Sequence, residues 1–294
     1  MPIRETRHTL EIGKGIPLHY RIVRGPSQRR PLLLLLHGMA SNLTRWSEFV
    51  EQTSLKDHWD IMRVDLRGHG EPIYRGRLSM EIWSQDTVRL LDAEGYAEAV
   101  LIGHSLGAQL ALHFASLCPN RTRGLALIDP ILGRPTTPIV RAGRRYRHVL
   151  RALVIIVRAL NRLGLYRRHI PNRDLKLLDL RTRETLLAEG KIEELVSEYS
   201  SPWPDLKHFP TANFIEEVIE MVRSVPPPTQ IEVPVLVLLS KGGTYADPKT
   251  TREAIAQFPN AKTVIIDAEH WPLTEKPVEV REAIEQWCNE LERP

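Results

Sequence analysis

The stretch that most constrains the fold of this chain is residues 97–118, where an apolar run leads directly into a helical pattern. The run "AEAVLIGH" is typical of a strand buried on both faces, and "LGAQLALHFASLC" is typical of a helix. Between them lies a serine, Ser105, with a glycine two residues before it and another two residues after it. A turn this tight needs glycines, because side chains there would collide with the neighbouring strand and helix. The turn also projects the serine at the carboxyl end of the sheet, where open α/β folds bind ligands.

The same alternation of apolar runs and helical patterns extends over most of the chain, with one interruption. It predicts an α/β fold with a mostly parallel, doubly wound sheet of eight strands. No convincing strand occurs within 131–230, so we predict a helical lid there, inserted into a core formed by 1–130 and 231–294. The strands are expected as a hairpin within 8–25 and at 31–38, 59–65, 97–104, 123–129, 233–240 and 261–267. The helices are expected at 44–55, 80–95, 106–118, 248–258 and 277–291.

The serine between strand and helix is predicted to be a nucleophile. Two flanking glycines in this context form the turn that exposes a catalytic hydroxyl, whereas a helix-capping serine would need neither. A serine hydroxyl is a poor nucleophile unless a base, itself held by a third group, removes its proton. His270, in "VIIDAEHWP", follows the last expected strand and is therefore the expected base for Ser105.

Two aspartates compete for the role of the acid that holds this histidine. Asp247, in "SKGGTYADP" after the strand at 233–240, is preferred, although an aspartate before a proline is also a good helix start. Asp129, at the end of "LALID", is the alternative, since some enzymes of this layout take the acid from the preceding strand. The sequence leaves both open.

Further groups are expected around the substrate. An oxyanion needs two preorganised donors, which we assign to the backbone N–H groups of Leu106 and Met39. An aromatic and proline-rich stretch at 198–214 is expected to form an arm over the pocket. Trp203, Phe209 and Phe214 in this stretch are candidates either for the acyl site or for the core of the lid.

The basic character of the chain is local. Residues 131–170 contain ten arginines and no Asp or Glu, while the chain as a whole has a net charge of +4. A uniform nucleic-acid binder would not show this distribution. Taken as a helix, 144–163 has an arginine side and an apolar side. The arginines are Arg144, Arg147, Arg151, Arg158 and Arg162, and the opposing residues are Val149, Leu150, Leu153, Ile156, Val157, Leu160 and Leu163.

Three interpretations of this helix are open. The favoured one is a lid helix whose apolar face covers the site and whose arginines face water. The others are attraction of a basic amphipathic helix to anionic lipid surfaces, and steering of an anionic acyl substrate.

The motifs together resemble the α/β-hydrolase superfamily, and within it the lidded esterase, lipase and C–C hydrolase branch. The matching pieces are "HGMASN", "DLRGHG", "GHSLGA", the strand followed by "ADP", and "EHWP" followed by "EKPVEV". The resemblance implies an acyl-enzyme mechanism on a small-molecule carboxylic ester with a hydrophobic acyl or alcohol part, without a metal or organic cofactor. A C–C bond hydrolase, thioesterase or lactonase would use the same triad. A non-catalytic binding module normally lacks the serine or the histidine.

The cellular compartment is expected to be the cytoplasm. The first residues have no apolar core segment typical of a secretory signal, and the two cysteines, Cys118 and Cys288, lack metal-like spacing. The longest apolar stretches are too short, or too interrupted by arginine, to cross a bilayer.

Overall fold

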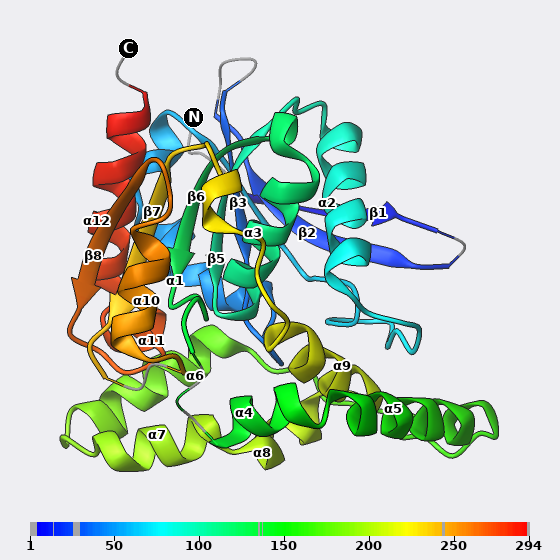
Figure 1. Cartoon of the computed structure of the whole chain (residues 1–294). Coiled ribbons are helices and arrows are strands. Elements are labelled where there is room, and N and C mark those ends of the chain that lie inside the picture. The colour runs from blue at the N-terminus through cyan, green and yellow to red at the C-terminus, as the bar shows by residue number, and fades with distance from the viewer. Residues whose placement is uncertain are drawn as a thin grey trace.

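A computed structural model describes residues 5–13, 15–25, 30–134, 136, 138–242 and 245–292, and shows a single twisted sheet between two layers of helices (Figure 1). Eight strands form the sheet in the order β1-β2-β4-β3-β5-β6-β7-β8. The pairs β1–β2 and β2–β4 are antiparallel, and all other neighbouring pairs are parallel. The predicted mostly parallel, eight-stranded fold is therefore confirmed. The strands are β1 (Glu5–Glu11), β2 (Pro17–Val23), β3 (Leu32–Leu36), β4 (Asp60–Val64), β5 (Ala99–His104), β6 (Thr122–Ile128), β7 (Val235–Ser240) and β8 (Ala261–Ile266).

The central strands are continuous apolar runs because helices cover both of their faces. Every residue of β3, β5 and β7 is buried. On one face Leu34 packs in a core with Phe114, and on the other Leu35 packs in a core with Trp287. The covering helices and turns are α1 (Ser47–Gln52), α2 (Met80–Glu94), α3 (Leu106–Leu117), α10 (Pro248–Ile255), α11 (Pro272–Glu275) and α12 (Pro277–Leu291).

A helical insertion lies between β6 and β7, below the carboxyl ends of the parallel strands and opposite the two chain termini in Figure 1. No strand occurs in the described part of 131–230, in agreement with the predicted lid. The exact division at 130 and 231 stays a prediction. The helices of the insertion are α4 (Pro138–Arg145), α5 (Arg147–Arg162), α6 (Leu175–Thr182) with a π-helical turn (Arg183–Leu187), α7 (Ile192–Ser200), α8 (Pro202–His208) and α9 (Thr211–Met221).

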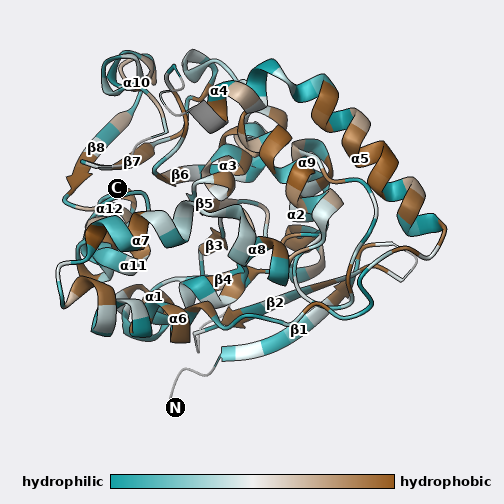
Figure 2. Ribbon diagram, turned by 90° about the horizontal axis from the view of Figure 1, so that it is seen from below, coloured by the Kyte–Doolittle hydropathy of each residue, from teal (hydrophilic) through white to brown (hydrophobic). Residues whose placement is uncertain are grey.

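The expected helix over 144–163 is broken at Tyr146, between α4 and α5, and its orientation corrects the favoured interpretation. Val154 is buried where α5 packs on α9, and Arg158, one turn further along the same side of α5, forms an ion pair with Glu216 of α9. The apolar side expected to cover the site faces outward instead. Its exposed residues are Val149 (62%), Leu153 (42%), Ile156 (55%), Leu160 (41%) and, just beyond the helix, Leu163 (77%). Figure 2 shows these hydrophobic segments along the outer edge of the insertion.

Candidate active site

The tight turn after β5 places Ser105 at the first turn of α3. Its backbone has φ 52° and ψ −111°, which is strained for a residue with a side chain, and its N–H donates to the Ile128 carbonyl at 2.9 Å. A Cβ on Gly103 would lie 2.3 Å from the Gly107 carbonyl carbon. A Cβ on Gly107 would lie 2.3 Å from the Leu36 carbonyl oxygen. Both glycines are therefore needed for the close approach of strand and helix, as the sequence indicated.

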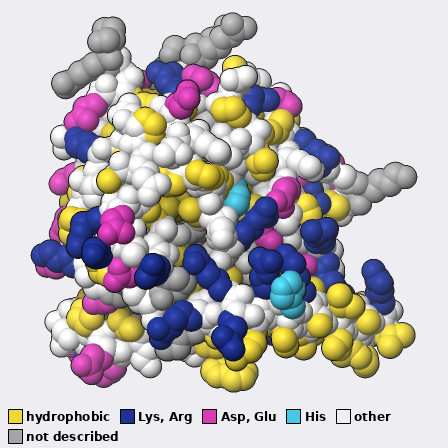
Figure 3. All heavy atoms as spheres, in the orientation of Figure 1, with side chains coloured by type: hydrophobic (Ala, Val, Ile, Leu, Met, Phe, Trp, Pro, Cys, Tyr) yellow, Lys and Arg dark blue, Asp and Glu magenta, His cyan; other side chains and the backbone are white. Residues whose placement is uncertain are grey.

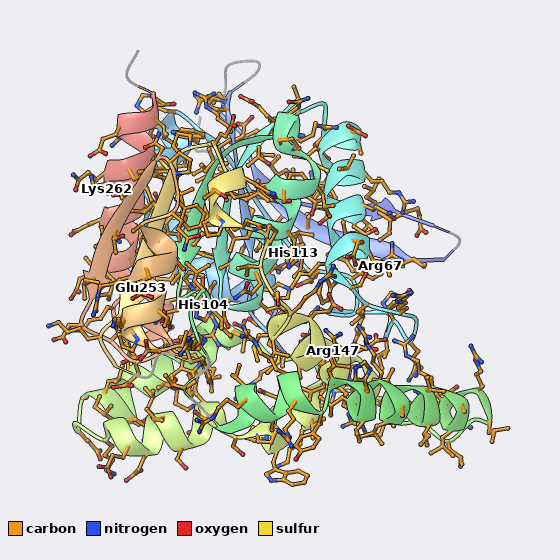
Figure 4. The ribbon with its side chains drawn as sticks, viewed as in Figure 1. Arg67, His104, His113, Arg147, Glu253 and Lys262 are labelled. Carbon is orange, nitrogen blue, oxygen red and sulfur yellow. The ribbon has the colours of Figure 1, made fainter. Side chains whose placement is uncertain are left out.

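His270 lies in the loop between β8 and α11, with Nε2 3.0 Å from Ser105 Oγ. The loop is held by His104, whose Nε2 donates to the His270 carbonyl at 2.9 Å. Burial and the neighbouring His270 lower the pKa of His104 to about 3, so His104 is neutral near pH 7, and its bond to the carbonyl requires the tautomer with the proton on Nε2. Figure 4 shows His104 at the lower end of β5, close to the insertion. The structure thus brings together Ser105 and His270, the predicted nucleophile and base.

The carboxylate beside this histidine belongs to Asp129, directly after β6. Asp129 Oδ2 lies 3.5 Å from His270 Nδ1, and both side chains are buried. Ser240, at the end of β7, donates its backbone N–H to Asp129 Oδ1 at 2.7 Å and its hydroxyl to Oδ2 at 2.6 Å. These two bonds fix the carboxylate. A separation of 3.5 Å is long for a hydrogen bond, but such contacts commonly tighten when substrate binds.

Asp247, the acid preferred from the sequence, lies elsewhere, and the structure reverses the order of the two candidates. Its carboxylate caps α10, where Oδ1 accepts the Thr250 N–H at 2.8 Å. This bond lowers the pKa of Asp247. Within the described part of the chain, none of the hydrogen bonds or ion pairs of Asp247 involves His270. In this structure Asp247 starts the helix at Pro248, which is the second of its two expected uses. Two residues of the preceding "KGGTYAD" stretch, Gly243 and Thr244, lie outside the described residues.

The expected oxyanion donors belong to the first turn of α3 and to the loop after β3. Leu106 is the first residue of α3, where backbone N–H groups lack partners within the helix. Met39 lies in the loop after β3 and lines the cavity beside Ser105. This loop is tied to the insertion, because the Ala40 N–H donates to Glu217 Oε2 of α9 at 2.8 Å.

Glu217 is a site-shaping residue that sequence reasoning missed. Its Oε1 lies 2.7 Å from His69 Nε2, and both side chains are fully buried. Burial opposes protonation of His69, but the Glu217 and Asp65 carboxylates outweigh it and raise the pKa of His69. An ion pair thus links the turn after β4 to α9. No local pattern marks Glu217, since a glutamate in the middle of a helix is ordinarily solvated.

The cavity in front of Ser105 has a volume of about 170 Å³ and an apolar wall supplied largely by the insertion. Phe214 is the one of the three aromatic candidates that lines it. Phe209 is buried against the ring of His69, at 4.5 Å between centroids, where the insertion meets the turn after β4. Trp203 has a side chain 72% exposed and points to solvent. The apolar lining residues of the insertion include Leu175, Leu178, Phe214, Val218, Met221 and Val222.

The two arginines that border the cavity are both paired with aspartates. Arg45 forms an ion pair with Asp179 and donates to Thr274 Oγ1 at 2.8 Å. Arg173 lies 3.5 Å from Asp205, whose pKa burial raises to about 6. Each positive charge therefore has a neighbouring counter-charge.

The fold and the serine–histidine–aspartate arrangement define an α/β-hydrolase, and comparison with known sequences agrees. The model of the alpha/beta hydrolase family matches residues 33–283, so the chain belongs to this family and is a hydrolase.

Some known proteins are similar over nearly the whole chain. The chain is 24% identical over 288 residues to the sn-1-specific diacylglycerol lipase ABHD11 of Mus musculus, covering 92% of this chain and 85% of the relative. A thermophilic esterase from Thermogutta terrifontis superposes with a TM-score of 0.67 at 23% identity, covering 99% of this chain and 100% of the esterase. An enol-lactonase from Burkholderia xenovorans superposes with a TM-score of 0.63 at 21% identity, covering 94% and 96% of the two chains. These structural likenesses show the shared fold.

Proposed function

We propose that this hydrolase cleaves carboxylic esters that are neutral and carry a hydrophobic acyl or alcohol part. The observation that carries the proposal is the 3.0 Å separation of His270 Nε2 and Ser105 Oγ at the wall of an apolar cavity. A nucleophile, a base within hydrogen-bond reach and an adjoining acid form the arrangement that acyl transfer requires.

The first half of the reaction forms an acyl-enzyme. His270 takes the hydroxyl proton as Ser105 Oγ attacks the ester carbonyl carbon, and the backbone N–H groups of Leu106 and Met39 stabilise the resulting oxyanion. When the tetrahedral intermediate collapses, the carbon–oxygen bond to the alcohol breaks. The alcohol leaves with the proton from His270, and the acyl group stays on Ser105.

The second half releases the acid. His270 removes a proton from water, the hydroxide attacks the acyl carbon, and Ser105 leaves with the proton returned by His270. Asp129 accepts the Nδ1–H of His270 throughout, which selects the tautomer with a free Nε2 lone pair and stabilises the imidazolium when it forms. Ser240 positions this carboxylate.

The class of substrate rests on the cavity and on the relatives. Apolar walls and paired charges support a neutral, hydrophobic ester, and two of the proteins that the chain resembles are a lipase and an esterase. The lactonase among the structural neighbours shows that one fold serves several related reactions. We propose that the insertion acts as a lid that shapes the acyl site through Phe214 and its neighbours.

Two measurements test the proposal. A fluorophosphonate probe should label the wild type and should not label Ser105→Ala, because the phosphonate traps an activated serine. A series of p-nitrophenyl esters of increasing acyl length, beside matched thioesters, lactones and a carboxylate-bearing ester, should show the highest kcat/KM for neutral oxygen esters. No labelling of the wild type would contradict a serine mechanism. Labelling with a clear preference for thioesters, lactones or anionic esters would contradict the substrate class alone.

A further inference from the structure

The outer face of α5 is a hydrophobic surface that the fold leaves uncovered. Val149, Ile156 and Leu163 are 62%, 55% and 77% exposed, and Leu153 and Leu160 lie between them on the same side of the helix. Soluble proteins rarely expose a continuous row of large apolar side chains unless the row meets a partner. This row on α5 is called here the apolar edge.

The surroundings of the apolar edge are strongly basic. The side chains of Arg147, Arg151 and Arg162 on α5 are exposed, and the segment 131–170 contains no Asp or Glu. Figure 3 shows hydrophobic side chains along the lower edge of the molecule, with Lys and Arg gathered directly above them. Figure 4 shows Arg147 above the start of α5. The charge pattern therefore favours a negatively charged occupant.

We propose that the apolar edge docks onto the surface of an anionic lipid membrane, with α5 lying parallel to the bilayer plane. The helix has the properties of an interfacial helix, which are a pronounced apolar side, several exposed arginines outside that side and no acidic residue. None of the described helices is long and apolar enough to cross a membrane. The contact is therefore confined to the headgroup region, where arginine side chains reach the lipid phosphates while the apolar side chains enter the acyl boundary.

A second copy of this chain fits the surface less well. In a two-fold interface the same patch appears on both partners, so two apolar edges facing each other would bring their arginine borders together. With no acidic residue in 131–170 to compensate, these like charges would repel. An anionic membrane can bury the apolar row and at the same time neutralise the charge of the arginines.

The position of the surface links it to the cavity. Pro202 and Pro204, which flank the exposed Trp203 on α8, line the cavity in front of Ser105. Figure 1 shows α4, α5 and α8 together on the side of the insertion that faces away from the sheet. Docking on this side would bring the wall of the cavity to the membrane surface, where hydrophobic esters are concentrated. The binding itself does not depend on the proposed activity.

The test is co-sedimentation of the full-length protein with vesicles of phosphatidylcholine that contain about one third phosphatidylglycerol. We expect binding to these vesicles and much weaker binding to pure phosphatidylcholine. Raising NaCl from about 0.05 M to about 0.5 M should weaken it at least tenfold, because salt screens the arginines. The Ser105→Ala variant should bind like the wild type, which separates docking from catalysis.

Two sets of variants locate the surface. The triple change Val149→Gln, Ile156→Gln and Leu163→Gln should weaken binding at least about a hundredfold, since each side chain of this size contributes roughly tenfold when it is buried. Changing Arg147, Arg151 and Arg162 to Gln should also weaken it about a hundredfold, at about fivefold per arginine near an anionic surface. Gln is a good helix former, so α5 should remain folded.

A matched control uses exposed apolar residues far from α5. Leu117, Ile265 and Val278 are 54%, 55% and 47% exposed, and their triple change to Gln should leave vesicle binding unchanged. Absence of wild-type binding at low salt, or equal loss in this control, would overturn the proposal. A concentration-dependent dimer that the Val149, Ile156 and Leu163 variant abolishes, without vesicle binding, would also overturn it in favour of a second copy.

Discussion

The aspartate beside His270 gives the sharpest test of the site, because Asp129→Asn and Asp247→Asn are the same chemical change at two predicted positions. Asp129 Oδ2 lies 3.5 Å from His270 Nδ1. Asp247 caps α10 through the Thr250 N–H at 2.8 Å. The structure therefore predicts a catalytic defect for the first change and almost none for the second.

The expected loss of kcat in Asp129→Asn follows from what the carboxylate does. An amide in its place can donate to Nδ1 and so hold the wrong tautomer, in which Nε2 carries a proton and cannot accept one from Ser105. In serine–histidine–aspartate sites this change lowers kcat by about 10⁴, or roughly 5.5 kcal/mol in the activation barrier. The Ser240 N–H and hydroxyl, which now donate to the carboxylate, would meet an amide instead, so a moderate loss of stability is also expected.

The expected effect of Asp247→Asn on kcat and on stability is small for an equally specific reason. Asparagine caps helices about as well as aspartate, so only the favourable interaction of a negative charge with the helix N-terminus is lost. Because the Asp247 carboxylate is accessible to solvent, that interaction makes only a small contribution to stability and none to the barrier.

The assay is steady-state kinetics on one p-nitrophenyl ester, together with thermal unfolding of both variants. We expect kcat of Asp129→Asn near the detection limit and kcat of Asp247→Asn within about twofold of the wild type. A crippled Asp247→Asn beside an active Asp129→Asn would refute the assignment. It would show that the loop before α10 rearranges in the working enzyme.

Three further predictions concern residues that support the site. Ser240→Ala removes one of the two donors to Asp129 and should lower kcat on the same ester about tenfold, with little change in KM. An unchanged kcat would contradict the role of Ser240 in positioning Asp129. Gly107→Ala places a Cβ 2.3 Å from the Leu36 carbonyl oxygen and should cost about 1–3 kcal/mol, measured by urea unfolding; full wild-type stability would contradict the packing. The pKa of Asp205 is raised from 3.8 to about 6, so its protonated form stabilises the fold below pH 3.8 and that stabilisation is lost as the pH rises through 6. Relative to the wild type, the free energy of unfolding of Asp205→Asn should therefore increase from pH 4 to pH 7 by up to about 3 kcal/mol, as measured by unfolding at both pH values. A difference between the two proteins that does not change with pH would refute the shifted pKa.

The fold and two site residues could be predicted from the sequence because their signals are local. The apolar runs of β3, β5 and β7 and the helical patterns between them fix the alternation from which the parallel sheet follows. The glycines around Ser105 mark a turn whose geometry is set within five residues. His270 could be found because the carboxyl ends of parallel strands meet at one edge of the sheet, so a histidine after the last strand lies near the serine.

The acid could not be decided in this way. Asp129 and Asp247 both follow strands that are neighbours in the sheet, and sequence spacing does not say which carboxylate turns toward His270. The choice depends on competing local partners. The Thr250 N–H holds Asp247 at the start of α10, whereas the Ser240 donors hold Asp129 at the sheet edge. These partners are defined only when β6 and β7 lie side by side.

The orientation of α5 shows the same division between sequence and tertiary structure. A period of 3.6 residues separates an arginine side from an apolar side, but it does not say which side meets the rest of the protein. The orientation of α5 is decided by its packing on α9. There Glu216 forms an ion pair with Arg158 of α5, which lies 58 positions before Glu216 in the chain. The sequence by itself determined that α5 is amphipathic. Only the packing of α5 on α9 directed its apolar side outward, because a partly buried arginine requires a carboxylate beside it and exposed leucines do not.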